Sequence, residues 1–162
     1  MISEIHYQID SKHCKVILKK NIEKHLISDL KKLGSDKKVL FLYDENKNIE
    51  NIKKIIKLKK NFYLKVFKKK IKKKKKNKSI KNVLNIIDLL IANKFTKKSV
   101  IISCGGGVVG DMSGLLSSLY LRGTYYFHIP TTMTAIVDSC VGGKTAINYK
   151  GIINCLGGYH HP

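Results

Sequence analysis

The segment of residues 99–120 constrains the fold more than any other part of this 162-residue chain. An apolar run at 99–103 is followed by a glycine-rich turn at 105–111 and then by helical spacing at 112–120. A buried strand, glycines and a helix start together bring backbone N–H groups against a phosphate. Three successive glycines remove Cβ atoms from the turn and permit positive φ angles. Although the spacing is not GxGxxG, the segment predicts an anion-binding turn, in which Asp111 can accept hydrogen bonds from a sugar hydroxyl.

The pattern of apolar residues elsewhere predicts an α/β fold. We expect a Rossmann-like, mostly parallel sheet with flanking helices and an N-terminal β-hairpin. The expected strands are 5–9, 15–18, 39–43, 62–67, 100–103 and 125–129. The expected helices are 22–33 ending at Gly34, 49–58, and 79–94 with Ser79 as N-cap. A helix should also follow the glycines, and a short helix should start at Thr131 before an irregular glycine-rich end. Ligands bind at the carboxyl ends of such strands, where Asp44, the glycine turn and Thr131 all fall.

Lysine dominates the composition, with 31 lysines against one arginine and a formal net charge of +21. Residues 1–98 hold 29 of the basic and 9 of the acidic residues, whereas residues 99–162 hold only 3 and 2. Because Lys, Asn and Ile have A/T-rich codons, we interpret the excess as mutational bias in an A/T-rich genome. The second part of the chain resists this bias, as expected where a core and a ligand site determine the side chains.

The densest lysine run lies at residues 68–76, and it predicts a solvated, Lys-rich loop at about 68–78. The alternative is a basic surface for nucleic acid or an anionic membrane. No aromatic residue interrupts the run, and no helix-turn-helix or zinc spacing is visible. We therefore expect no nucleic-acid and no membrane partner.

The remaining features favour a cytoplasmic protein with one domain over residues 1–162. The first ten residues contain charges and lack the apolar core of a secretory signal. No run approaches the roughly 18 apolar residues of a membrane span, and residues 83–92 instead predict a helix that faces the core. The four cysteines lack C-x-x-C spacing, which predicts free thiols.

Short motifs follow the glycine turn in a fixed order. They are Tyr-Leu-Arg-Gly at 120–123, Pro-Thr-Thr at 130–132, Val-Asp-Ser-Cys-Val-Gly-Gly-Lys-Thr at 137–145 and then Asn148. In order and spacing the series resembles 3-dehydroquinate synthase, whose blocks read approximately GGGVVGD, YxRG, PTT, VDSSVGGKT and N. The resemblance covers roughly the last 60 residues and is looser before them, where its best point is the segment 42–46.

The resemblance implies an NAD-dependent lyase of the shikimate pathway, which leads to chorismate and the aromatic amino acids. Such an enzyme converts 3-deoxy-D-arabino-heptulosonate 7-phosphate to 3-dehydroquinate and phosphate, with transient oxidation by bound NAD. A divalent metal, zinc or cobalt, polarises the alcohol that is oxidised. The resemblance also implies a homodimer.

Roles are carried over from the family residue by residue. The residues expected to contact NAD are Asp44, Asn46, Lys78, Gly105, Gly106, Gly107, Val108, Asp111, Thr131, Thr132, Asp138 and Lys144. Those expected to act on the substrate are Asp138, Lys144 and Asn154. Arg122 would bind the substrate phosphate across a dimer interface, since the planar guanidinium makes two parallel bonds that lysine cannot reproduce.

Each assignment has a purely structural alternative. Asp138 fits a turn cap, Lys144 fits a surface lysine, and Thr131 with Thr132 fits a helix start after proline. Arg122 fits a salt bridge or a helix end. The functional roles are favoured because Lys144 is one of only two lysines after residue 98 and Arg122 is the only arginine in the sequence.

Three departures from the family pattern bear on activity. The acid that binds the cofactor ribose in the family is a lysine in segment 73–79, where Lys78 and Ser79 are retained. The family's Lys-Asn pair is Ile153 and Asn154 here. The family's helical C-terminal domain, with its metal-binding Glu and two His, has no counterpart in this sequence, and none of the six histidines has zinc-helix spacing. We therefore expect no metal site in this chain and a separate C-terminal half that supplies it.

Two classes of function stay open at this point. The first is an enzyme, either the nucleotide-binding part of a 3-dehydroquinate synthase or a related sugar-phosphate cyclase. A metal-dependent alcohol or glycerol dehydrogenase shares the glycine turn but lacks the whole motif series. The second class is non-catalytic: a degenerate fragment, or a basic binding module that keeps the fold.

Overall fold

A computed structural model describes residues 3–9, 12–18, 22–33, 36, 38–44, 64–72 and 75–162. Its centre is a sheet of four strands in the order β4–β3–β5–β6, and every neighbouring pair is parallel. The strands are β3 (Lys38–Asp44), β4 (Lys65–Ile71), β5 (Val100–Gly105) and β6 (Tyr125–Pro130). The predicted parallel α/β fold is confirmed.

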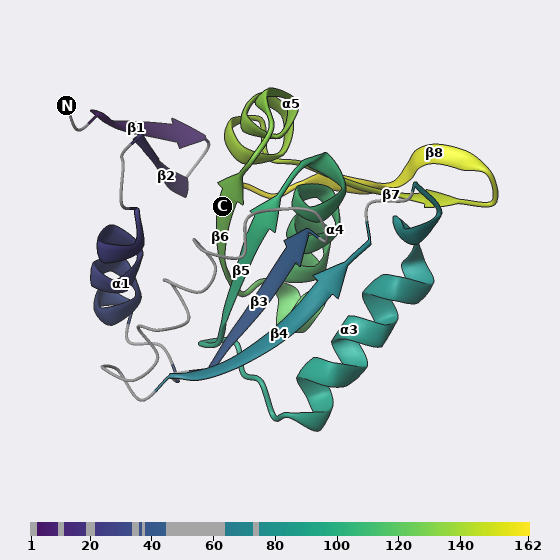
Figure 1. Ribbon diagram of the computed structural model, residues 1–162, viewed down its shortest axis with the longest axis horizontal. Helices are drawn as coiled ribbons and strands as arrows, with labels where there is room; N and C mark the ends of the chain where they lie inside the picture. Colours follow the sequence, from purple (N-terminus) through teal and green to yellow (C-terminus); the bar gives the residue numbers. More distant parts are fainter. Residues whose placement is uncertain are drawn as a thin grey trace.

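Helices cover both faces of this sheet (Figure 1). Helices α3 (Ile80–Ala92) and α4 (Gly107–Leu119) pack on one face, and α1 (Glu23–Lys32) packs on the other. Alternate residues of β3 show why, since Leu40 belongs to the core under α3 and α4 whereas Phe41 belongs to the core under α1. Strands that are buried on both faces read as continuous apolar runs, which is the pattern seen in the sequence.

A separate antiparallel hairpin of β1 (Ser3–Ile9) and β2 (Lys12–Leu18) precedes α1, as predicted. The expected helix at 79–94 is also present as α3, and it buries Val83, Ile86 and Leu90. Ser79 occupies its N-cap position without a side-chain cap bond. The expected helix at 49–58, the Gly34 cap and Asn46 lie outside the described residues.

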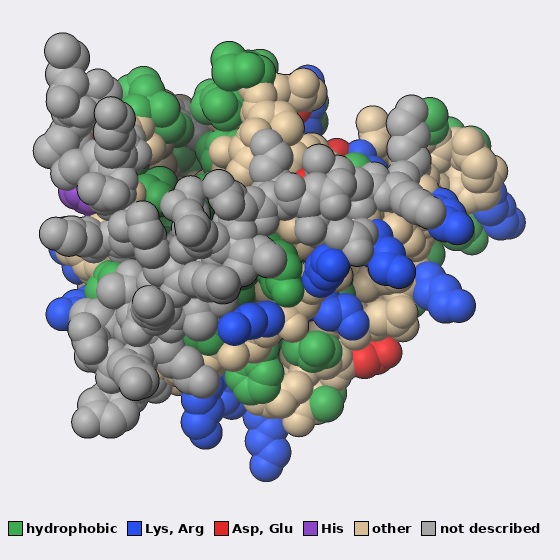
Figure 2. Space-filling view, viewed as in Figure 1, with side chains coloured by type: hydrophobic (Ala, Val, Ile, Leu, Met, Phe, Trp, Pro, Cys, Tyr) green, Lys and Arg blue, Asp and Glu red, His purple; other side chains and the backbone are tan. Residues whose placement is uncertain are grey.

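The Lys-rich loop expected at 68–78 is wrong for its first part. Strand β4 continues to Ile71 and pairs with β3, so Lys68 is opposite Phe41 and Ile71 is opposite Asp44. Among the described strands β4 lies at the sheet edge, where exposed lysine side chains reach water while the backbone keeps its ladder. On the face in Figure 2, lysines stand out over this part of the molecule. After the strand, Lys75–Asn77 forms a single 3₁₀ turn, η2.

The glycine-rich end is a second hairpin and not the irregular segment that we expected. Strand β7 (Lys144–Tyr149) pairs antiparallel with β8 (Ile152–Tyr159). A Cβ atom on Gly157 would overlap the neighbouring strand and lie 2.7 Å from Cα of Ala146. Here glycine permits close strand contact, which a composition-based prediction of irregular structure misses.

Short helical turns connect these elements. After α4 come η3 (Tyr120–Arg122) and β6, and then α5 (Met133–Ala135) continues directly into the π-helix η4 (Ile136–Val141). Single π turns of this kind occur often at functional sites. No helix in the described ranges is long and apolar enough to cross a bilayer.

Candidate functional site

The carboxyl ends of three neighbouring strands meet around the glycine turn. Strand β5 ends at Gly105, Gly106 is the N-cap of α4, and the helix starts at Gly107. Thr131, just after β6, donates its backbone N–H to the carbonyl of Gly105 at 2.9 Å. Asp44, at the end of β3, is only 1% exposed and lies beside Gly105. The structure therefore brings Asp44, the glycines and Thr131 together, as predicted.

The three glycines of the turn differ in what a side chain at their position would meet. A Cβ atom on Gly105 would lie 2.7 Å from Cγ2 of Val109, and one on Gly106 would lie 3.3 Å from Cγ2 of Thr132. A Cβ atom on Gly107 would meet no atom of the described structure within 4 Å. None of the three has a positive φ, so the turn does not use the left-handed conformation that glycine permits. Gly105 permits internal packing, whereas Gly107 leaves open space in front of the helix N-terminus.

The first turn of α4 presents backbone donors to this space. Val109 and Gly110 both donate their N–H groups to the carbonyl of Gly106, at 3.1 and 3.0 Å. Bonds of this kind begin with Val109, so the N–H groups of Gly107 and Val108 have no acceptor within the helix. Free N–H groups and the positive end of the helix dipole favour an anion at this position.

Lys78, Asp111 and Asn154 form a cluster next to the turn. The Lys78 ammonium donates to the carboxylate of Asp111 in α4 and to the side-chain oxygen of Asn154 in β8. Lys78 is 7% exposed, which is unusual for lysine outside an ion pair. Burial raises the pKa of Asp111, and the bond from Lys78 offsets part of that rise. Three residues predicted separately as cofactor or catalytic groups are thus in direct contact.

Asn148, a residue of the motif series, holds Asn154 in place. Its side-chain oxygen accepts the backbone N–H of Asn154 at 3.0 Å, and its own N–H donates to the carbonyl of Lys78 at 2.8 Å. Asn154 has a left-handed backbone with φ of 55°, a conformation that asparagine tolerates better than most residues. Ile153, which stands where the family has lysine, is 62% exposed.

Asp138 and Lys144 form a second, more open pair. The carboxylate of Asp138 in η4 lies 2.9 Å from the ammonium of Lys144 at the start of β7. Their side chains are 42% and 58% exposed. The hydrogen bond that Lys144 donates to Asp138 raises the pKa of Lys144, so the lysine is a cation at neutral pH. The structure joins these two predicted residues, and Asp138 is an ion-pair partner of Lys144 as well as part of a turn.

Thr132 takes the structural role that the sequence left open. It is the N-cap of α5, and its hydroxyl accepts the N–H of Ala135 at 3.2 Å. The same side chain lies next to Gly106. Thr132 therefore couples the glycine turn to the segment that carries Asp138.

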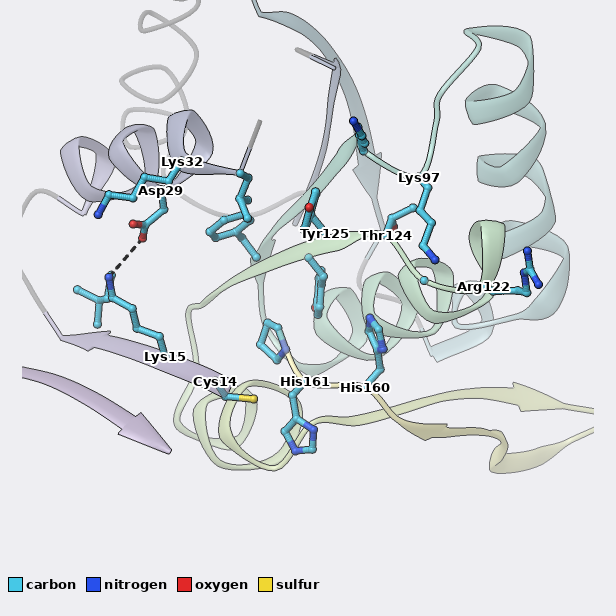
Figure 3. A pocket seen from close by; sticks show the side chains of 17 residues that line it. Cys14, Lys15, Asp29, Lys32, Lys97, Arg122, Thr124, Tyr125, His160 and His161 are labelled. Carbon is cyan, nitrogen blue, oxygen red and sulfur yellow. Dashed lines mark ion pairs between the residues drawn. The ribbon is translucent and has the colours of Figure 1, made fainter. Parts of the chain in front are cut away.

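Arg122 is not part of this arrangement within the described chain. It lies beyond Leu119, the last residue of α4, which is itself about 12 Å along the helix axis from Asp111, given 1.5 Å per residue. Figure 3 shows Arg122 at one end of a cavity of about 960 Å³, with the Lys15–Asp29 ion pair at the other. Its predicted contact with a phosphate across a dimer interface stays a prediction.

A buried polar network behind the glycine turn was not predicted from sequence. Ser103 Oγ lies 2.7 Å from Nδ1 of His128 and 3.1 Å from the hydroxyl of Tyr126, and Ser139 Oγ lies 3.2 Å from Nε2 of His128. Burial lowers the pKa of His128 to about 4, against a smaller opposing effect of the Ser103 backbone. A Cβ atom on Gly110 would overlap Ser139 and lie 2.8 Å from Nε2 of His128. The sequence feature that could have indicated this network is the inward-facing position of His128 in a predicted strand.

Metal-binding groups do not come together in the parts of the chain that the structure describes. There, no three His, Cys, Asp or Glu side chains are arranged to hold an ion. The cysteines are free thiols, with Cys14, Cys104 and Cys140 buried and Cys155 exposed. These residues do not fit the divalent metal that the sequence resemblance implies.

Comparison with known proteins identifies the family. Residues 68–162 match the family model of the 3-dehydroquinate synthase N-terminal region. The chain belongs to the 3-dehydroquinate synthase family. It is 51% identical over 73 residues to the 3-dehydroquinate synthase of Clostridium tetani, and 48% identical over 75 residues to that of Streptococcus pyogenes serotype M6. These matches cover 45% and 46% of this chain but only 20% and 21% of the relatives, so the matched segment spans about a fifth of their length.

Solved structures share the fold over almost the whole chain. A 2-deoxy-scyllo-inosose synthase superposes with a TM-score of 0.88 at 19% identity, over 99% of this chain and 45% of that one. The 2-epi-5-epi-valiolone synthase of Streptomyces hygroscopicus, solved with NAD+ and Zn²⁺, gives 0.79 at 24% identity, over 96% and 42%. A butanol dehydrogenase from Thermotoga maritima gives 0.60 at 16% identity, over 83% and 39%. This chain therefore shares the fold of these two sugar-phosphate cyclases.

Proposed function

We propose that this chain is the NAD-binding part of a 3-dehydroquinate synthase. That enzyme converts 3-deoxy-D-arabino-heptulosonate 7-phosphate to 3-dehydroquinate and phosphate. The observation that carries the proposal is the open space around a Cβ at Gly107, one helical turn before Asp111 of the Lys78–Asp111–Asn154 cluster. Both lie in the segment 68–162 that matches the family.

The residues around the turn fit a dinucleotide. The N–H groups of Gly107 and Val108 would receive the pyrophosphate at the start of α4. Asp44 would lie toward the adenosine half, and Lys78, Asp111, Thr131 and Thr132 would border the remainder. When bound, oxidised NAD supplies a hydride acceptor for the substrate alcohol. Asn46 belongs to the same expected set and lies outside the described residues.

Lys144 and Asn154 would hold the substrate. Because Asp138 raises the pKa of Lys144, its ammonium is a hydrogen-bond donor for an anionic group and is unsuited to accept a proton at neutral pH. The side-chain amide of Asn154 is uncharged and its oxygen accepts from Lys78, while Asn148 holds the backbone N–H of Asn154, which suits the amide to orient a hydroxyl. Asp138 would hold the Lys144 ammonium toward the substrate.

The activity also needs groups that the described residues do not assemble. No metal site forms among them, so the proposal includes a C-terminal half that contributes the metal ligands. In a dimer, Arg122 of one chain would reach the substrate phosphate of the other, and we propose the homodimer on that ground. The charge-assisted fork of an arginine is well matched to phosphate.

NAD titration by isothermal calorimetry tests the cofactor site. Gly107→Val should abolish binding, because the added methyls meet no protein atom near Cβ and instead fill the proposed pyrophosphate position. Gly158→Val is the matched control, since a Cβ on Gly158 also meets no atom within 4 Å but lies in β8. Equal NAD binding by both variants and the parent would place the cofactor elsewhere. Loss of binding in the control as well would show a general defect.

A related sugar-phosphate cyclase is the second candidate. The solved cyclases cover more of this chain than the curated synthases do, and one was solved with carbaglucose-6-phosphate, NAD+ and Co²⁺. Identity favours the synthase, at 51% against 19–24%. Phosphate release from the heptulosonate phosphate, and not from glucose 6-phosphate, by the reconstituted enzyme would decide between them. An unmodified chain that binds no NAD would support a degenerate fragment.

A further inference from the structure

The buried network around His128 links three elements behind the cofactor turn. Tyr126 and His128 come from β6, Ser103 from β5, and Ser139 from the π-helix η4. All four side chains are buried, and the two serines contact opposite ring nitrogens of His128. An imidazole held at both nitrogens has a defined ring orientation and a defined tautomer.

The bond from Ser139 to the backbone favours a proton on Nε2 of His128. Ser139 Oγ donates its only hydrogen to the carbonyl of Ala135 at 3.1 Å, so it accepts from Nε2 of His128. In a neutral ring Nδ1 is then an acceptor, and Ser103 Oγ donates to it. The Tyr126 hydroxyl lies 3.1 Å from Ser103 Oγ and donates its single hydrogen to the carbonyl of Gly110 at 3.2 Å. This assignment satisfies both ring nitrogens.

The network reaches the proposed site from two sides. Ser139 is adjacent to Asp138, the residue that pairs with Lys144. Gly110 is adjacent to Asp111, the partner of Lys78, and its Cα lies close against His128 and Ser139. The ring of His128 therefore separates and supports the two segments that present Asp138 and Asp111.

We propose that His128, as its neutral Nε2–H tautomer, is a positioning residue that fixes η4 and the first turn of α4 for cofactor binding. It contacts neither NAD nor substrate and acts through Ser139 and Gly110. The inference rests on the proposed function for its effect on NAD, whereas the tautomer itself is independent of that function. Ionisable side chains on the surrounding elements are Tyr126 in β6, Cys104 in β5, Asp111 in α4, and Asp138 and Cys140 in η4.

Long-range ¹H–¹⁵N NMR of the ¹⁵N-labelled full chain tests the tautomer directly. His128 should show a neutral Nε2–H ring from about pH 8 down to about pH 5. An Nδ1–H tautomer, or titration of His128 near the ordinary histidine pKa of about 6.5, would overturn the proposal. This result does not depend on whether the chain binds NAD.

NAD affinity tests the positioning role. His128→Leu removes both ring bonds and should weaken NAD binding by about tenfold or more, whereas His128→Gln retains a donor and an acceptor and should restore most of it. The parent should lose affinity as His128 gains charge in acid, and the Gln variant should not show this loss. If the Leu variant does not fold, the pH profiles of the parent and the Gln variant decide. Identical profiles would refute the role, and a parent that binds no NAD would refute the proposed function instead.

Discussion

At the scale of single residues, neighbouring glycines of one turn have unrelated reasons for being glycine. Gly105 and Gly110 lie against other side chains, whereas Gly107 borders open space. All three belong to the same family-like motif, and the sequence alone cannot separate those that serve packing from those that admit a ligand. The separation depends on residues distant in sequence, such as His128 and Ser139 beside Gly110.

Gly110→Ala is expected to destabilise the fold by about 1–3 kcal/mol, because the new methyl overlaps Ser139 and lies 2.8 Å from Nε2 of His128. Gly107→Ala should change stability by less than about 1 kcal/mol, since its methyl meets no described atom within 4 Å and alanine favours the helix. Urea unfolding of the two variants measures the difference. Equal stabilities would mean that the network relaxes around Gly110 without cost.

Acid should destabilise the protein through His128. Its folded pKa of about 4 lies below the ordinary value near 6.5, so between these values the unfolded chain binds the extra proton. The stabilisation is fully present above about pH 6.5 and falls by about 3 kcal/mol as the pH drops to 4. Urea unfolding between pH 7 and 4.5 should show this loss in the parent, and His128→Gln should lack that component. Parallel pH profiles for the two proteins would exclude His128 as its source.

At the scale of elements, sequence patterns predicted the buried strands better than the exposed ones. Strands β3 and β5 are continuous apolar runs buried on both faces, and their predicted positions match within two residues. Strand β4 was placed too early, because Lys68 and its neighbours have no apolar pattern. Pairing with β3 extends that strand whatever its exposed side chains are.

The candidate site was predictable to a similar extent. The family resemblance singled out Lys78, Asp111, Asp138, Lys144 and Asn154, and the fold joins them in one cluster of three and one pair, while their roles stay predictions. The His128 network was not predictable, because a histidine, two serines and a tyrosine on separate elements have no sequence spacing in common. Only the packing of β5, β6 and η4 brings them together.

Exposed lysines of β4 should not contribute to cofactor binding. Replacing Lys68 and Lys69 by Ser should change NAD affinity by less than about tenfold, because solvent and salt screen exposed charges. Calorimetry of the double variant against the parent measures this. Tight binding of DNA or RNA by the parent at physiological salt, lost in the variant, would instead support a basic binding module.

At the scale of the whole molecule, the lysine-rich part of the chain ends at about residue 98, where the part that contributes most of the candidate site begins. Nearly all of the lysine excess lies before it, whereas most of the candidate site lies after it. Lys78 is the exception, since it is a buried lysine from the basic part that enters the site. Mutational bias can therefore enrich lysine on the exposed surface without changing the residues that the two cores and the site require.

The chain alone is expected to show no 3-dehydroquinate synthase activity and no tightly bound transition metal, because its described residues form no metal site. Assays of phosphate release with zinc or cobalt, NAD and the heptulosonate phosphate measure the first, and elemental analysis measures the second. A separately expressed C-terminal half should restore turnover. In the restored enzyme, Arg122→Lys should weaken substrate binding by about 1–3 kcal/mol, because lysine keeps the charge and loses the fork. Turnover by the chain alone would contradict the prediction.

The contact between Lys78 and Asn154 also determines when during synthesis the site can form. These residues are 76 positions apart, and Asn154 lies in the last described strand. The four parallel strands and both hydrophobic cores involve little beyond residue 130, so they can assemble before the β7–β8 hairpin has been synthesised. A nascent chain released before β8 would thus have its sheet and its glycine turn, but its Lys78 ammonium would lack one of its two ligands. The folding of β8 onto β7 is therefore the step that completes the Lys78–Asn154 contact.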